Sequence, residues 1–342
     1  MLIKAAREGL SAPVNLTWEI TLRCNLRCRH CLSGSGRPHP QELSTGECLA
    51  VIDQLVDLQV FQINIGGGEP FARSDFFTIL EYAVARDIVV CISTNGTLLT
   101  SAICRRLADL EGIYLQVSLD GADQQTNDHI RGRGTYQSAL HGMSLLADRN
   151  VAFSINTVLT RYSFGQLAAL KTLAGGYGAS LRVSRFRPSG RAKACWQELA
   201  PPKEQLEYFA EWLQQDPDVL TGDSFFSLTS ERRRRLGLDL CGAAKMTCCL
   251  APEGNIYPCA FLQEPQFKAG HIRDQQLGDI WRDSPVLRNF RRLEIHSCHG
   301  CHRFDSCRGG CPAVAYHIHQ DLSQPDPECL MKCLGPMAAE AV

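Results

Sequence analysis

The sequence lacks the features that would send a chain into or across a membrane. The N-terminal segment MLIKAAREGL has no apolar signal core, and no stretch approaches the roughly 18 consecutive apolar residues of a membrane span. An excess of charge of one sign is also missing, because 35 Lys and Arg stand against 36 Asp and Glu. This balance gives no general attraction to nucleic acid or to anionic membranes. We therefore expect a cytoplasmic protein that binds neither nucleic acid nor membrane.

Cysteine, by contrast, is abundant: the chain of 342 residues contains 17. A cysteine-rich chain without an export signal is expected to use its thiols for metals rather than for disulfides. The length predicts about two domains.

Three of the cysteines, Cys24, Cys28 and Cys31, fall within eight residues with the spacing C-x3-C-x2-C. Three thiolates this close on one loop can hold three corners of a [4Fe–4S] cluster, which leaves one iron free for another molecule. Structural zinc normally takes four ligands, so a zinc knuckle completed by His30 is the alternative. Thiolate-only ligation favours the iron–sulfur interpretation.

Around this loop the sequence alternates between short apolar runs and amphipathic stretches. Ser44 and Glu47 form a capping box for one expected helix, and Ser74 and Thr100 are candidate caps for the next two. Six such units predict an α/β fold with a parallel sheet, and six are too few for a closed eight-stranded barrel. We expect a partial (β/α)6 TIM-like barrel with strands at residues 14–20, 61–65, 89–93, 113–119, 152–158 and 180–185.

In parallel β/α barrels the chemistry gathers in the loops after the strands. The distinctive loops of this chain all follow predicted strands, so they are expected at one face. They contain the cysteine triad, Gly67-Gly68-Glu69-Pro70, Ser93 and Asn95, Ser118 and Asp120, Asn156, and residues 185–191.

The C-terminal part carries a second group of cysteines. Cys241 is followed by C-x12-G-x4-C spacing to Cys259, and a C-x2-C-x5-C-x3-C run begins at Cys298. Eight thiolates would complete two four-ligand clusters, and two zinc sites are the alternative. We therefore expect domains at residues 1–200 and 237–342, joined by a helical bridge at residues 201–236.

The triad resembles the signature of the radical S-adenosylmethionine (SAM) enzymes, and the C-terminal pattern resembles the SPASM domain. The first resemblance implies that SAM binds the open iron, that Glu69 receives the SAM amino group, and that Arg131, or its rival Arg133, pairs with the SAM carboxylate. It also implies SAM contacts for Gly67, Gly68, Pro70, Ser93, Asn95, Ser118, Asp120 and Asn156.

The second resemblance implies two auxiliary iron–sulfur clusters. One takes Cys241, Cys248, Cys259 and Cys311, and the other takes Cys298, Cys301, Cys307 and Cys329. Cys249 could replace Cys248, and Cys333 could replace Cys329.

The motifs NIGGGEP (64–70), RPSGR (187–191), LTGDSFF (220–226) and CRGGCP (307–312) resemble those of the mycofactocin maturase family. That resemblance implies a small ribosomal precursor peptide as substrate, a separate peptide-carrier protein, and a reductase or a flavodoxin- or ferredoxin-type electron donor. It implies oxidative decarboxylation of the C-terminal tyrosine of a Val-Tyr end, followed by a Val–Tyr carbon–carbon bond.

Asn156, Arg185 and Arg187 are candidates for holding the peptide. The alternatives are another SPASM peptide maturase, which forms a pyrroloquinoline quinone-type cross-link, a thioether or formylglycine, and a non-catalytic zinc scaffold.

Overall fold

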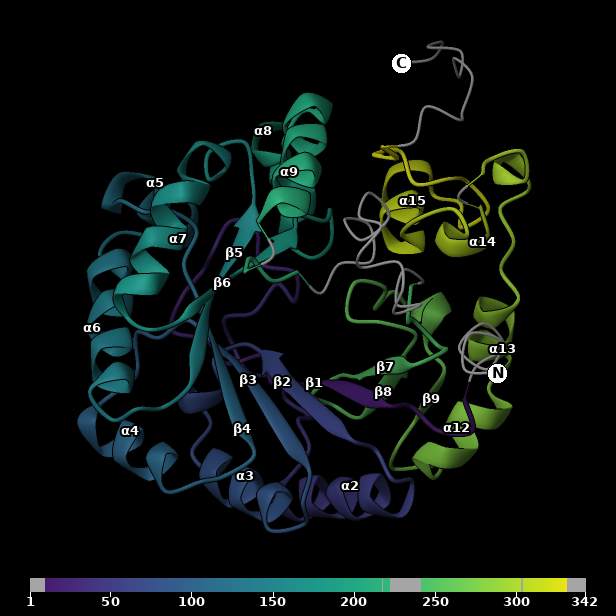
Figure 1. Cartoon of the computed structure of the whole chain (residues 1–342). Helices are drawn as coiled ribbons and strands as arrows, with labels where there is room; N and C mark the ends of the chain where they lie inside the picture. Colours follow the sequence, from purple (N-terminus) through teal and green to yellow (C-terminus); the bar gives the residue numbers. More distant parts are fainter. Residues whose placement is uncertain (1–9, 217, 222–240, 303, 331–342) are drawn as a thin grey trace.

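The computed structural model describes residues 10–216, 218–221, 241–302 and 304–330. Its centre is a curved sheet with helices along its outer side (Figure 1). The strands follow the order β6-β5-β4-β3-β2-β1-β7-β8-β9 across the sheet. Their bounds are β1 Asn15–Thr21, β2 Gln62–Gly67, β3 Val89–Thr94, β4 Ile113–Ser118, β5 Phe153–Leu159, β6 Ser180–Arg185, β7 Thr247–Leu250, β8 Asn255–Tyr257 and β9 Gly270–His271.

The first six strands confirm the partial barrel. Each is parallel to the strand of the preceding unit. Strands β6 and β9 lie at the two ends of the sheet, so the barrel is not closed. The expected strand at residues 180–185 matches β6, and the other five agree to within one or two residues at each end.

Side chains of the strands alternate between two environments. Leu16, Trp18 and Ile20 of β1 belong to the hydrophobic core under the helices and are at most 1% exposed. Thr17 and Glu19, which lie between them, face a cavity inside the barrel. A closed barrel of this type fills its interior with branched apolar side chains. Here the interior is polar at these positions, so it can admit a polar ligand.

Most of the helices cover the outside of the barrel (Figure 1). The capping box at Ser44 is confirmed, and Thr100 caps its helix as predicted. The prediction that Ser74 caps the next helix is wrong, because the N-cap residue of that helix is Asp75. The short helix α5 escaped prediction. The bounds are α2 Thr45–Asp57, α3 Phe76–Val84, α4 Ser101–Ala108, α5 Gln124–Arg131, α6 Thr135–Ala147, α7 Leu167–Gly176, α8 Ala192–Leu199 and α9 Lys203–Gln215.

The C-terminal region joins the barrel through the sheet itself. Strand β7 pairs with β1 in parallel, and β8 and β9 continue the sheet antiparallel. Cys333 and most of the bridge at residues 201–236 beyond α9 lie outside the described residues. Among the described residues, no helix is both long enough and apolar enough to cross a membrane. The remaining helices are α12 Leu277–Asp283, α13 Pro285–Arg291, α14 Phe304–Cys307 and α15 Pro312–His319.

A tight contact between α6 and the loop after β3 gives a test of the packing. A Cβ atom on Gly142 would lie 2.3 Å from the carbonyl oxygen of Gly96, whereas one on Gly46 in α2 would meet nothing within 4 Å. We expect Gly142→Ala to lower the free energy of unfolding by about 1–3 kcal/mol through overpacking. Gly46→Ala should instead raise it by up to about 1 kcal/mol through helix propensity. Denaturant unfolding of both variants checks this, and stabilisation by both would contradict the packing.

Candidate functional site

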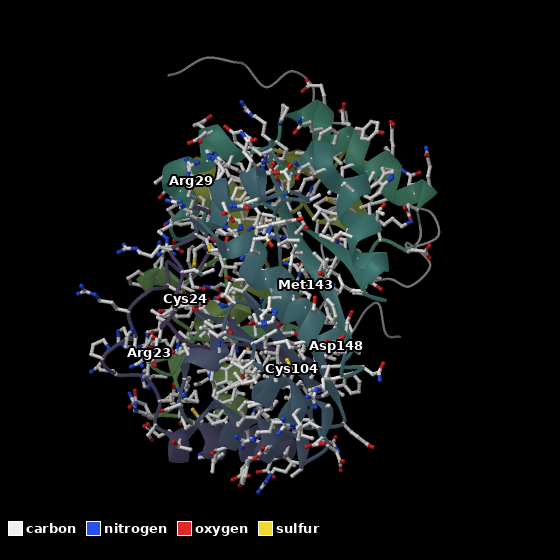
Figure 2. All side chains as sticks on the ribbon, turned by 90° about the vertical axis from the view of Figure 1, so that its left-hand side faces the viewer. Arg23, Cys24, Arg29, Cys104, Met143 and Asp148 are labelled. Carbon is white, nitrogen blue, oxygen red and sulfur yellow. The ribbon has the colours of Figure 1, made fainter. Side chains whose placement is uncertain are left out.

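The loop that follows β1 brings its three cysteines to one cavity. Cys24, Cys28 and Cys31 all line this cavity at the ends of the barrel strands. In Figure 2, Cys24 lies between Arg23 below and Arg29 above. Strands β2 to β5 and the segments after them supply the other predicted residues that line the cavity, which are Gly67, Gly68, Ser93, Asn95, Ser118, Arg131 and Asn156.

Polar contacts hold the cysteine loop in place from its flanks. Asn95 donates a hydrogen bond of 3.0 Å from its side-chain nitrogen to the Oδ1 atom of Asn25, and Asn25 donates one of 2.8 Å to Thr97. A Cβ atom on Gly68 would lie 2.2 Å from the carbonyl oxygen of Arg23. Only glycine permits such an approach, so Gly68 seats the cysteine loop against β2.

The segment after β6 also contacts the cysteine loop. Arg191 donates hydrogen bonds to the carbonyl oxygens of Cys28, at 3.0 Å, and Ser35, at 2.6 Å. Gly190 has φ +56° and presses against the carbonyl oxygen of Leu32, where a Cβ atom would come within 2.1 Å. Sequence reasoning singled out RPSGR as a motif but did not assign Arg191. Its role depends on a partner more than 150 residues earlier in the chain.

Glu69 is not among the residues that line the cavity, and its predicted contact with SAM stays a prediction. Its carboxylate is fully buried and accepts hydrogen bonds from Thr94 Oγ1 and from the backbone N–H of Asn95, both at 2.8 Å, and from the N–H of Phe71 at 3.3 Å. Burial raises the pKa of Glu69 to about 7. The side chain ties the loops after β2 and β3 together, and the cavity is lined by Gly67 and Gly68 rather than by Glu69 or Pro70.

Arg131 lies in the cavity wall, held by a buried carboxylate. Its Nε atom is 2.6 Å from Asp120 Oδ2, and His30 Nε2 is 2.7 Å from the same oxygen. Asp120 is fully buried behind Arg131, and the guanidinium holds the pKa of that carboxyl well below its usual range. Asp120 therefore positions Arg131 and His30. Arg133 is exposed and does not line the cavity, so the geometry favours Arg131 over its rival.

Two further residues line the cavity without having been predicted in their observed roles. Glu19 of β1 is 2% exposed, and its carboxyl is hydrogen-bonded to Ser33 Oγ. His30 was considered only as a possible zinc ligand, yet it lines the cavity and pairs with Asp120. The alternation of apolar and polar residues in β1 was the signal that could have found Glu19.

The protonation state of the cavity thiols depends on whether a metal is bound. Burial raises the pKa of Cys24 to about 11 and also raises that of Cys28. Without a metal these groups are protonated at neutral pH, and a coordinated metal deprotonates a thiol. The three thiols share one cavity with backbone glycines and one buried arginine, a set that suits a cluster with one open iron and an amino-acid ligand on it.

Five of the predicted auxiliary ligands fall into two neighbourhoods. The thiols of Cys241, Cys259 and Cys311 interact electrostatically with one another, and those of Cys307 and Cys329 do the same. This grouping agrees with the predicted partition, although the ligand assignments themselves stay predictions.

The fourth ligand of the first set fits Cys248 less well than Cys249. In the register, Cys248 pairs with Leu16, which faces the helices, whereas Cys249 pairs with Thr17, which faces the cavity. Burial raises the pKa of Cys248 to about 12, and Arg291 is its charged neighbour. The thiol of Cys249, in contrast, interacts with that of Cys259.

Arg185 and Arg187 are engaged elsewhere than predicted. The Arg185 side chain is 1% exposed and forms ion pairs with Asp326 and Glu328. The guanidinium of Arg187 lies 4.3 Å from the centre of the Phe261 ring. Neither lines the cavity, because both reach toward the C-terminal region; of the three candidates for holding the peptide, Asn156 does line it.

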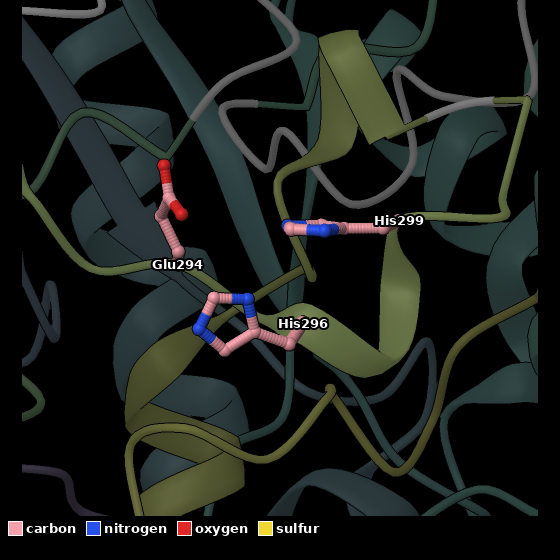
Figure 3. A group of neighbouring side chains, drawn as sticks. All are labelled: Glu294, His296 and His299. Atoms are coloured by element: carbon pink, nitrogen blue, oxygen red, sulfur yellow. The ribbon is translucent and has the colours of Figure 1, made fainter.

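One group of surface residues also converges. Possible ligand atoms of Glu294, His296 and His299 lie within 4.8 Å of one another, and all three residues are exposed (Figure 3). Imidazole and carboxylate donors suit zinc better than an iron–sulfur cluster. Zinc found in a purified sample therefore has a possible location apart from the buried thiols.

Comparison with known proteins identifies the families that this chain resembles. A model of the radical SAM superfamily matches residues 18–170, and a model of the SPASM iron–sulfur cluster-binding domain matches residues 241–303. The mycofactocin maturase MftC of Mycolicibacterium smegmatis is 42% identical over 96% of this chain and 86% of its own length. An AdoMet-dependent heme synthase of Methanosarcina barkeri is 30% identical, over 94% of this chain and 97% of its own.

Among solved structures, SuiB of Streptococcus suis bound to S-adenosylmethionine has a TM-score of 0.79 at 20% identity, covering 95% of this chain and 79% of that one. The fold and the thiol-lined cavity thus define a radical SAM enzyme with a SPASM domain, which uses SAM and iron–sulfur clusters. Within that class, the chain belongs to the mycofactocin maturase family.

The buried ion pair behind the cavity gives a prediction for stability. Asp120→Asn leaves the Arg131 guanidinium buried without its charged partner, so we expect a loss of about 3 kcal/mol in the free energy of unfolding. Because the native pKa of Asp120 is lowered, the parent loses this advantage as the pH falls below the usual aspartate range. The matched control is Asp123→Asn at the exposed N-cap of α5, where Asn caps as well as Asp. Equal stability of both variants in denaturant titrations at pH 7 would contradict the assignment.

The register of β7 predicts different effects for its two cysteines. Cys249→Ser should lower the iron content of the reconstituted chain by up to one cluster, about four atoms. Cys248→Ser should leave the iron content unchanged, since its thiol faces the helices. Iron and sulfide analysis of both variants checks this, and the reverse pattern would make Cys248 the ligand.

Proposed function

We propose that this enzyme modifies the Val-Tyr end of a small ribosomal precursor peptide. It oxidatively decarboxylates the C-terminal tyrosine and then joins the tyrosine and valine by a carbon–carbon bond in a second SAM-dependent step. The observation that carries the proposal is the 42% identity to a mycofactocin maturase over 96% of the chain. The SuiB fold neighbour has also been solved with its precursor peptide SuiA.

The first step has a fixed balance of atoms. The peptide loses one formic-acid equivalent, which is CO2 plus two hydrogens. The bonds from Cα to the carboxyl group and from Cβ to hydrogen break, and a double bond forms between Cα and Cβ of the former tyrosine. When bound at Cys24, Cys28 and Cys31, the cluster and SAM supply the radical that takes one hydrogen atom from Cβ. The second hydrogen leaves as a proton with one electron, and we propose that the C-terminal thiols hold the acceptor for that electron.

The chain's own residues would position the reactants. Arg131, fixed by Asp120, presents a guanidinium suited to the carboxylate of SAM. Asn95, Ser93 and Ser118 offer amide and hydroxyl groups to its polar parts. Leu32 and Ala260 contribute apolar surface to the same cavity, which helps to keep water from a radical. Asn156 also lines the cavity, and its Oδ1 atom accepts a hydrogen bond of 2.9 Å from Ser184.

The auxiliary sites and partners complete the proposal. Cys241, Cys259 and Cys311 would hold one cluster, with Cys249 or Cys248 as fourth ligand. Cys298, Cys301, Cys307 and Cys329 would hold the other. We further propose a cytoplasmic enzyme that receives its peptide from a separate carrier protein and its electrons from a reductase or a flavodoxin- or ferredoxin-type donor.

The proposal predicts a specific product. Protein reconstituted anaerobically with iron and sulfide, then given reductant, SAM, a Val-Tyr-ending precursor and its carrier, should form 5′-deoxyadenosine and a peptide lighter by one formic-acid equivalent. The triple variant Cys24→Ala, Cys28→Ala, Cys31→Ala should contain about four fewer iron atoms and form neither product. Chromatography and mass spectrometry measure both.

Two results would count against parts of the proposal. Deoxyadenosine with an unchanged peptide would leave a radical SAM enzyme with a different substrate. Absence of deoxyadenosine from protein with its full iron complement would contradict the catalytic assignment.

A further inference from the structure

A buried ion-pair cluster joins the end of β6 to the last described cysteine loop. Arg185 donates hydrogen bonds of 2.6 Å to each carboxylate oxygen of Asp326, and its Nε atom donates one of 2.7 Å to Glu328. The side chains of Arg185 and Asp326 are each 1% exposed, and that of Glu328 is 13% exposed. We call these three residues the Arg185 cluster. It connects positions more than 140 residues apart in the sequence.

Asp326 also organises the backbone around three predicted ligands. Its Oδ2 atom accepts a hydrogen bond of 2.9 Å from the N–H of Cys311. Its own N–H donates to the carbonyl of Gly309, and its carbonyl accepts from the N–H of Cys329 at 3.0 Å. Gly309 and Gly310 both have positive φ and complete the turn that begins at Cys307. One residue thus contacts the turn from 307 to 311 through its carboxylate and the loop that ends at 329 through its backbone.

Burial of the Arg185 cluster has a free-energy cost, because its charged groups lose their hydration. A buried ion pair rarely stabilises a fold more than apolar residues of the same volume would, because desolvation offsets the attraction. The Arg185 cluster places one guanidinium and two carboxyl groups beside the thiols, and Arg187 is a further positive neighbour of Glu328. Burial raises the pKa of Glu328, and the neighbouring guanidinium of Arg185 opposes that shift.

We infer that Arg185 and Asp326 are positioning residues for the auxiliary iron–sulfur clusters: they fix the loops of Cys307, Cys311 and Cys329 against the barrel, and their charges set the reduction potential of the clusters held there. The inference rests on the proposed auxiliary ligation. Net charge and hydrogen bonding near a cluster are established determinants of its potential.

The test uses opposite charge changes at the two ends of one ion pair. The background is the full chain with Cys24, Cys28 and Cys31 changed to Ala, so that only auxiliary clusters contribute to the spectra. Asp326→Asn removes a negative charge and keeps an acceptor for the Cys311 N–H. Arg185→Met removes the positive charge at similar length. Arg185→Lys restores the charge without the two-pronged geometry, and Asp321→Asn, at an exposed site in the same loop, is the matched control.

Redox titration monitored by electron paramagnetic resonance measures the midpoint potentials, and the expected shifts differ in sign between the variants. Removing a negative charge favours the reduced cluster, so Asp326→Asn should shift the midpoint potential upward. Arg185→Met should shift it downward, Arg185→Lys should recover most of that shift, and Asp321→Asn should match the background. Loss of iron from Asp326→Asn with intact circular dichroism would also support the inference, because it shows that the loops were positioned by that contact.

Three outcomes would overturn the inference. Unchanged potentials, spectra and iron in both Asp326→Asn and Arg185→Met would remove the role in tuning and positioning. Shifts of the same sign in both would exclude the charge effect. Global unfolding of both Asp326→Asn and Arg185→Lys would show that the Arg185 cluster supports the fold as a whole rather than the cysteine loops in particular. A background protein without any cluster would instead refute the proposed auxiliary ligation, which separates that failure from this one.

Discussion

The parallel pairing of β1 with β2 on one side and β7 on the other decides where chemistry occurs in this protein. Because β1 lies between the barrel and the C-terminal strands, the cysteine loop that follows it is adjacent to both. Loops from β2 to β5 reach the same cavity because parallel strands end at one edge of the sheet. The apolar faces of these strands and the helices outside them supply the rigid support that a positioned site requires.

The contacts that shape the site are mostly between segments far apart in the chain. Gly68 and Gly190 seat the cysteine loop by close backbone approach, and Arg191 ties it to the segment after β6. On the C-terminal side, Asp326 gathers two cysteine loops around itself. The protein thus holds its cysteine loops with close backbone contacts and with hydrogen bonds from charged side chains.

The sequence predicted the parts of this arrangement that depend on local chemistry. Alternating patterns located the six barrel strands, the capping box at Ser44 marked a helix start, and cysteine spacing identified the cavity loop. The buried position of the Glu69 carboxylate depends on hydrogen-bond donors at the end of the next strand. No local sequence pattern could therefore predict it. The partner of Arg185 lies more than 140 residues away, which is why a free guanidinium for the substrate was expected there. The choice between Cys248 and Cys249 required the register of β7, which pairs with the first strand of the chain.

The raised pKa values of the buried thiols have a consequence for how the protein matures. Burial raises the pKa of Cys24 and Cys241 to about 11 and that of Cys307 to about 12. Oxidants and alkylating agents react with the thiolate rather than the thiol. A folded chain without iron therefore holds these three thiols in their protonated, less reactive form at neutral pH. Each thiol that then accepts iron must release a proton, so mildly alkaline conditions favour filling of the sites.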